Sequence, residues 1–491
     1  MESESSTSPE AALTPIEDER ALPPKYCNEP MPVPASFVPV PTQAFRVHRK
    51  ALQAVAQPGT PRAARAAAAF PQPIPTPIPV PVPLPLVLGT RVLMWKQDPT
   101  VGEIGVRKAF LPGHVKAGPL DSRIRIEGMP PVSPNTFGDF IGVPGTAAFD
   151  SIHTFAVVRQ VLTMYQRARG GAVLPWQWNT GGNIDPLRVF PHAGETQNAF
   201  YSRSEKALKF FFFDTTSPPP LHRVFTCRSL DIVAHEAGHA ILDALKPSWL
   251  LINQPPQTGG LHESFGDLTA IFLALSQMDQ VEAIIAQTKA NLHNKTFLAD
   301  MAEEFGLALG RPNGLRNADN DLTLAQVGTE VHAISQVFTG AIYDIMADIF
   351  AFRRNSRLHD DAATLYETGQ YMLGLVLDAI IKAPAAGATF ADVANQMLAI
   401  AASDGSPPQF RTFIRNRFMV RQVVVAATPL GADDDSPLEA GIMDDPDAQQ
   451  DRQGCCGTMT HSEYLGDLEH ADEEYDQLKK AAGGKSKRAA E

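Results

Sequence analysis

The chain has 491 residues, is 44% hydrophobic and carries a formal net charge of −12. A chain of this size can bury one large core or two lobes, and no run approaches the ~18 to 20 uninterrupted apolar residues of a membrane span. The negative charge is concentrated from Gly431 onward, where sixteen acidic residues accompany six basic ones, so residues 91–430 are close to neutral. A near-neutral core argues against a nucleic-acid-binding surface, which would be basic.

The two ends of the chain differ in composition from its middle. Residues 1–90 contain many prolines, little periodic patterning and seven acidic against seven basic residues, so we expect a disordered, proline-rich arm. Residues 426–491 are expected to form an acidic disordered tail. Between them the sequence predicts an N-terminal α+β lobe over residues 91–245 and a helical C-terminal lobe over residues 246–425.

The N-terminus and the cysteines bear on the compartment in which the protein works. The first residues are acidic and polar, without the apolar segment of a secretory signal peptide. We therefore expect a cytoplasmic protein, or one exported by a route that reads no N-terminal signal. Cys27, Cys227 and the adjacent pair Cys455-Cys456 suggest no disulfide framework, which fits a reducing compartment.

The predicted elements pass from strands and loops to helices along the chain. Residues 91–145 mix short apolar runs with glycine and proline, as in loops and edge strands. Apolar residues recur at helical spacings of three and four within residues 149–169, and residues 189–214 favour strands. Helical patterns then cover residues 231–245, 263–276, 281–293, 332–352, 361–381, 390–402 and 408–415.

His235, Glu236 and His239 form a His-Glu-x-x-His motif, on which the functional prediction mainly depends. Residues four apart stack on one face of a helix, so both imidazoles can bind one metal ion while Glu236 points toward a bound water. The flanking residues are apolar, which indicates a buried helix in which imidazoles need partners. The alternative is a polar helix face whose histidines only form caps or pairs.

A second helical stretch can complete the site. Glu263 is the predicted third ligand, which leaves the fourth tetrahedral position open for water and so indicates a catalytic zinc site. Asp267, one turn later, is expected to accept the free ring N–H of His235. Zinc lowers the pKa of its bound water to about 7, so Glu236 can take the proton as the water attacks a carbonyl and then pass it to the leaving amine.

These motifs resemble the thermolysin-like zinc metallopeptidases of the gluzincin group. Four blocks match the family in order, namely Asn198 to Tyr201, Asp231 to His239, His262 to Asp267 and Val331 to Tyr343. The resemblance implies an α+β, two-lobed fold, in which a mixed β/α N-terminal lobe and a mainly helical C-terminal lobe hold the zinc site in the cleft between them. It also implies that Asn198 and Ala199 lie on an edge strand that pairs with the substrate, and that His332 donates to the oxyanion.

The sequence departs from the family at several positions. The tyrosine that follows the second histidine in the family is absent, which leaves more of the oxyanion stabilisation to His332. No acidic residue stands at the family's spacing to orient His332, although Glu330 or Asp321 could substitute. Asp231 matches a family calcium ligand, but Ala274 replaces the partner carboxylate. Calcium is therefore doubtful, and we prefer to interpret Asp231 as a helix N-cap.

The sequence supports one leading function and two alternatives. The leading prediction is a zinc-dependent endopeptidase that hydrolyses peptide bonds in extended substrates, with Arg316 resembling the family arginine that binds a substrate carbonyl. A surface arginine is the equal alternative for that residue. A narrow-specificity peptidase or aminopeptidase of the same chemistry and a non-catalytic zinc-binding interaction module also stay open. The expected partner is a peptide or protein substrate, with no nucleic acid and no membrane.

Overall fold

A computed structural model of the chain describes residues 89–99, 101, 105–215, 222–251, 254–311, 313–424 and 438–440. The predicted arm over residues 1–90, except its last two residues, lies outside the described residues. The predicted tail over residues 426–491, except residues 438–440, also lies outside them. All described residues belong to one unit, Leu84–Glu491, and they form the expected mixed α+β structure.

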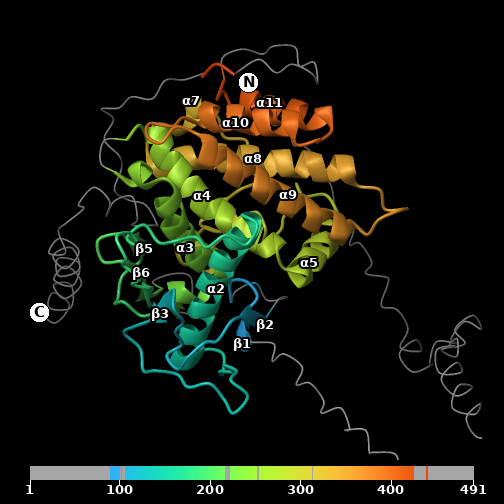
Figure 1. The fold of residues 1–491 in the computed structure, drawn as a ribbon. Coiled ribbons are helices and arrows are strands. Elements are labelled where there is room, and N and C mark those ends of the chain that lie inside the picture. The colour runs from blue at the N-terminus through green and yellow to red at the C-terminus, as the bar shows by residue number, and fades with distance from the viewer. Residues whose placement is uncertain are drawn as a thin grey trace, which may run out of the picture. The chain divides into compact units, whose positions relative to one another are not determined.

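Eight of the strands in the described residues precede the helix α3 (Leu230–Leu245) and lie in the blue to green part of the ribbon (Figure 1). They are β1 (Gly89–Trp95), β2 (Val106–Pro112), β3 (Ile124–Ile126), β4 (Leu187–Phe190), β5 (Ala199–Ser202), β6 (Ala207–Phe210), β7 (Phe212–Asp214) and β8 (Arg223–Phe225). β1 and β2 pair as an antiparallel hairpin, as do β7 and β8. The four-stranded sheet has the order β3-β4-β6-β5, in which β5 is antiparallel to β6 and forms an edge.

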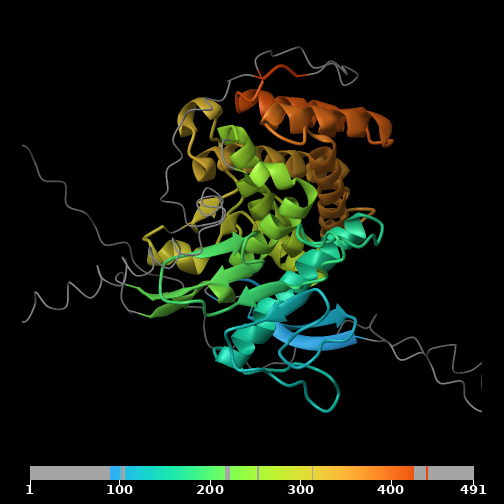
Figure 2. The ribbon, with the colours of Figure 1, turned by 60° about the vertical axis from the view of Figure 1, so that its left-hand side comes forward.

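The helix α2 (Ala147–Ala168) connects the strands to the rest of the core. It begins after Thr146, whose hydroxyl caps the helix by accepting from the Phe149 N–H. Most of its first five turns are buried, because it packs against β1 on one side and α3 on another (Figure 2). The predicted helix over residues 149–169 is therefore confirmed.

The second half of the described chain is mainly helical (Figure 1). Its elements are α3 (Leu230–Leu245), α4 (Pro256–Leu275), α5 (Met278–Thr288), β9 (Asp300–Met301), α6 (Glu303–Ala308), β10 (Arg316–Asn317), α7 (Leu324–Val327), α8 (Val331–Arg353), α9 (Asp361–Lys382), α10 (Phe390–Ser403) and α11 (Pro408–Val420). α4 lies at the centre: every one of its residues is buried, and it packs against α3, α8 and α9.

Three helix boundaries differ from the prediction by five residues or more, and one of them is the end of α11, which lies at Val420 instead of residue 415. α4 begins at Pro256, before the predicted start at residue 263, because Gly259 and Gly260 lie inside the helix instead of in a loop. A Cβ at Gly260 would come within 2.7 Å of the Ile334 side chain, so glycine permits close packing there. α5 ends at Thr288, before the predicted residue 293, because the next residue adopts a left-handed conformation.

The described helices, taken singly, differ from membrane spans in length or composition. No single one of them is long and apolar enough to cross a bilayer, although α4 and α5 satisfy the length and composition criteria as a pair bent by 94°.

Candidate metal centre

The metal-binding motif lies on α3, and the neighbouring helix α4 approaches it unusually closely. A Cβ at Gly238 of α3 would lie 3.2 Å from the Cα of Gly266 on α4 and 2.6 Å from the Thr269 hydroxyl. Because no side chain separates the two helices at Gly238, ligands from both can reach one point. This crossing brings Glu263 of α4 to the histidines of α3.

His235, His239 and Glu263 lie fully inside the protein, with ligand atoms within 4.8 Å of one another. The His235 Nε2 lies 3.3 Å from one Glu263 carboxylate oxygen, and the His239 Nε2 lies 3.6 Å from the other. A tetrahedral ion with bonds of about 2.0 Å holds its ligand atoms about 3.3 Å apart. Two imidazole nitrogens and a carboxylate oxygen at these separations fit a zinc ion.

Other side chains orient both imidazoles. The His235 Nδ1 lies 2.9 Å from Asp267 Oδ1, so Asp267 is placed to accept the ring N–H as the sequence predicts. The His239 Nδ1 lies 2.8 Å from the Nδ1 of His262, a residue for which the sequence suggested no such role. With both Nδ1 atoms engaged, both Nε2 atoms face Glu263 and are left for a metal ion.

Burial and neighbouring charges set the ionisation of these groups. Burial would raise the pKa of Glu263, but His332, His239 and His235 hold it well below its usual range. Burial lowers the pKa of His239 strongly and that of His262 to about 3, so both rings are neutral. The centre is therefore an ionised Glu263 beside a neutral His239, whereas Asp267 and Glu263 outweigh burial and raise the pKa of His235 to about 9, so a divalent ion must displace a proton from that ring.

His332 stands at the start of α8, beside the ligand group. Its Nε2 lies 3.4 Å from a Glu263 oxygen, and its Nδ1 lies 2.6 Å from Glu330 Oε1. Glu330 is also the N-cap of α8, accepting from the backbone N–H groups of His332 and Ala333. Of the two carboxylates that the sequence left open as the partner of His332, the structure therefore pairs Glu330 with it. Glu263 and Glu330 outweigh burial and raise the pKa of His332.

Arg316 is not a surface arginine. Only 11% of its side chain is exposed, and its guanidinium donates to both oxygens of Asp267 over 3.0 and 2.6 Å. This ion pair fixes Asp267, which in turn fixes the His235 ring. Contact between Arg316 and a substrate stays a prediction.

Two adjoining pockets open onto the centre. A small one of about 30 Å³ is lined by Ala199, Thr226, Asp231, Ile232, His235, Glu236, Asp267, Met301, Ala302, Phe305, Leu315 and Arg316. A larger one of about 380 Å³ is lined by Gln197, Phe305, Leu309, Arg311, Leu315, Arg316, Glu330, His332, Ala333 and Gln336. The two pockets share Phe305, Leu315 and Arg316, so together they connect the surroundings of Glu236 with those of His332.

The edge strand β5 begins beside the smaller pocket. Ala199 lines that pocket, as expected for a residue that contacts the substrate. Asn198 lines neither pocket, and its side-chain oxygen accepts from the Ala199 N–H over 2.9 Å. The structure thus brings Ala199 to the site and leaves the side chain of Asn198 bonded to its own backbone.

The interpretation of Asp231 as an N-cap is wrong. The cap of α3 is Ser229, and Asp231 lies inside the first turn, where its carboxylate accepts from the Ala302 N–H over 3.2 Å. Burial, together with repulsion from Asp98, raises the pKa of Asp231 to about 8.

Three further acidic residues lie close to Asp231 or to its neighbour Asp98, and we call the four the acidic cluster: Asp98, Asp231, Glu303 and Glu304. Burial with repulsion from Asp231 raises the pKa of Glu303 to about 10, and burial with repulsion from Asp98 raises that of Glu304 to about 8. The sequence did not indicate this cluster, because Asp98, Asp231 and the adjacent pair Glu303-Glu304 are far apart in the chain.

Solved structures similar to this chain include one metalloproteinase precursor. No protein-family model and no curated protein sequence matches the chain. The precursor of protealysin, a metalloproteinase from Serratia proteamaculans, is similar in structure with 15% sequence identity and a TM-score of 0.39, over 69% of this chain and 88% of that one. A sequence identity and a TM-score this low do not establish a function, so the geometry of His235, His239 and Glu263 carries the functional proposal.

Proposed function

We propose that this chain is a zinc-dependent endopeptidase. The observation that carries the proposal is the convergence of His235, His239 and Glu263, with tetrahedral donor separations, beside a pocket that Glu236 lines. A purely structural zinc site would have no use for a carboxylate in that position. The proposed architecture is the two-lobed one, with strands largely before α3 and helices after it.

A bound zinc ion would act as a Lewis acid and lower the pKa of a water molecule at the site. Glu236, one position after His235 on α3, takes the proton of the attacking water and returns it to the leaving nitrogen. Glu236 is buried, with only 1% of its surface exposed to solvent. A carboxylate held in such a position exchanges protons with the reacting groups without competition from bulk water.

His332 stabilises the negative charge that develops on the carbonyl oxygen. Glu330 accepts from its Nδ1–H, which keeps the ring oriented and favours its protonated form, so that Nε2–H can donate. Losing one such donor typically costs ~10²-fold or more in rate. Because the family's tyrosine is absent from this chain, His332 performs this role without it.

The substrate is an extended peptide segment. β5 is an edge strand that begins at Ala199, and an added peptide strand can pair with such an edge. The small pocket places Ile232, Phe305 and Leu315 around the space next to Glu236, which favours a small apolar side chain beside the cleaved bond. A role for Arg316 in binding the substrate carbonyl belongs to the same proposal.

The experiment compares purified wild-type chain with Glu236→Gln for zinc content and cleavage of a quenched peptide library. We expect wild type to cleave in a chelator-sensitive way, and Glu236→Gln to keep zinc while losing hydrolysis. Glu282→Gln is the matched control, because Glu282 lies exposed on α5. It should behave as wild type.

The same experiment separates the alternatives. Cleavage of single peptides only, or only from their N-termini, would favour the narrow-specificity peptidase or aminopeptidase. Zinc bound at His235, His239 and Glu263, seen as zinc lost in His239→Ala, without hydrolysis of any library member would refute the enzyme and favour the interaction module.

A further inference from the structure

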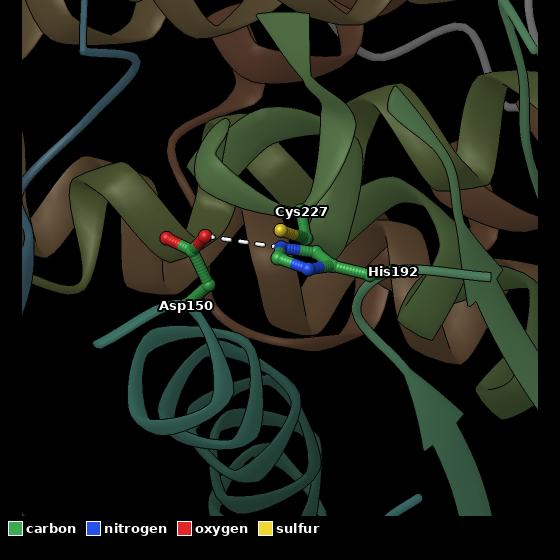
Figure 3. Close-up of side chains that lie close together, drawn as sticks. All are labelled: Asp150, His192 and Cys227. Atoms are coloured by element: carbon green, nitrogen blue, oxygen red, sulfur yellow. Dashed lines mark hydrogen bonds and ion pairs between the residues drawn. The ribbon is translucent and has the colours of Figure 1, made fainter. Parts of the chain in front are cut away.

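A second group of potential ligands lies away from the candidate metal centre (Figure 3). Asp150 stands in the first turn of α2, His192 follows β4, and Cys227 lies in the short 3-10 helix Thr226–Arg228 just before α3. Asp150 and Cys227 are completely buried, whereas the His192 side chain is 19% exposed. The group therefore has two buried potential metal ligands, Asp150 and Cys227, and one partly exposed ligand, His192, past which an ion can enter.

The distances within the group suit one ion. One ligand atom from each residue lies within 4.8 Å of the other two, and the His192 Nε2 is 3.1 Å from Asp150 Oδ2. Tetrahedral ligand atoms at bonds of about 2.0 Å would be about 3.3 Å apart. Figure 3 shows the Cys227 sulfur on the side of the imidazole that faces the carboxylate. Sulfur, nitrogen and oxygen thus converge on one space.

Arg228 is the charge that opposes a cation here. Its guanidinium donates to both oxygens of Asp150, each over 2.9 Å, and stacks over the Phe225 ring at 4.0 Å. A carboxylate oxygen can bind an ion and accept a hydrogen bond at once, so Arg228 can orient Asp150 in the way that outer partners orient metal ligands. With Asp150 and a Cys227 thiolate both negative and Arg228 positive, a divalent ion leaves a net charge of only about +1.

A nucleophilic role for Cys227 fits the structure less well. Burial and the Asp150 charge raise the pKa of the Cys227 thiol well above its usual range, so without a metal it stays protonated. The sulfur is also inaccessible to a substrate, whereas a metal ion is small enough to reach it past His192. A buried thiol beside an imidazole and a carboxylate is better suited to binding an ion than to attacking a substrate.

We propose that Asp150, His192 and Cys227 form a second metal site, which binds Zn²⁺ or a similar thiolate-preferring divalent ion with water as the fourth ligand. Binding replaces the thiol proton of Cys227, which passes to solvent, and moves the His192 proton from Nε2 to Nδ1. No electron transfer is involved. The ion joins α2, the segment after β4 and the 3-10 helix that precedes α3, so it supports the helix that carries His235 and His239.

Cobalt provides the test, because a thiolate ligand gives Co²⁺ a sulfur-to-metal charge-transfer band that imidazole and carboxylate ligands do not give. The chain is prepared in full length with Cys27, Cys455 and Cys456 changed to serine, so that Cys227 is its one thiol. We expect the band to appear as Co²⁺ is added to the metal-free protein. We also expect total zinc to reach two ions per chain, and one in Cys227→Ser.

Two variants show where the band comes from. His192→Gln should weaken cobalt binding at this site at least about tenfold, as for loss of a ligand, whereas His359→Gln, an exposed histidine between α8 and α9, should leave it unchanged. His239→Ala should empty the candidate metal centre and keep the band. Absence of the band at saturating cobalt, or its loss in His239→Ala, would overturn the proposal. If His192→Gln does not fold, the zinc stoichiometry of wild type against Cys227→Ser decides the outcome.

Discussion

Gly266→Ala should damage the candidate metal centre although it replaces none of the ligands. A Cβ at this position would lie 2.6 Å from both Cε1 and Nδ1 of His235 and 2.8 Å from its Cγ. Ordinary carbon contacts are about 3.5–4.0 Å, so the imidazole or the helix must move by about 1 Å. His235 cannot give way freely, because its Nδ1 is bonded to Asp267 and its Nε2 faces Glu263.

The size of the effect follows from this displacement. Forcing an extra methyl group into a packed interior costs about 1–3 kcal/mol. The gain in helix propensity from glycine to alanine is about 0.5–1 kcal/mol, which is too small to offset it. If the His235 ring turns away from Asp267, zinc affinity should fall about 10–100-fold, as when an outer partner of a ligand is lost.

Chelator competition measures the zinc affinity of Gly266→Ala, with a thermal melt alongside. Gly374→Ala is the control, because a Cβ there meets no atom within 4 Å and Gly374 lies inside the helix α9. We expect Gly374→Ala to keep zinc affinity and to gain slightly in stability. A Gly266→Ala variant with zinc affinity within about twofold of wild type would refute the reasoning.

Three further predictions concern neighbouring groups. Glu330→Gln removes the charge beside His332, and steady-state kinetics should show kcat reduced about 10-fold or more with less change in KM. His262→Leu deprives the His239 Nδ1 of its partner, so chelator competition should show about 10–100-fold weaker zinc binding. In the folded protein, Asp231, Glu303 and Glu304 of the acidic cluster stay protonated up to their raised pKa values of about 8 to 10. In the unfolded chain the same carboxyl groups release their protons near about pH 4. The free energy of unfolding should therefore fall as the pH rises from about 4 toward those raised pKa values. Thermal melts from about pH 6 to about pH 9 should show this fall, and Glu303→Gln should reduce it. A melting temperature that rises over this range would contradict the assignment.

The motif on α3 was predictable from the sequence because its geometry is local. A helix places residues four apart on one face whatever surrounds it, so the relation of His235 to His239 needs no tertiary information. The apolar periodicity likewise predicted α2 and most of the later helices, since each must bury one face. That Glu263 and Asp267 lie on one face of a helix was predictable because they are four residues apart, whereas the start of α4 was not predicted correctly.

Only the tertiary structure decided which distant groups meet. The contact of His262 with His239 depends on how α4 packs against α3, whereas Glu330 and not Asp321 meets His332 because Glu330 is the N-cap of the helix α8, in whose first turn His332 lies. The acidic cluster and the group around Cys227 join segments separated by tens to about two hundred residues along the chain. No periodicity connects such segments, because their relative positions are set by the packing of whole helices and strands and not by the geometry of one element.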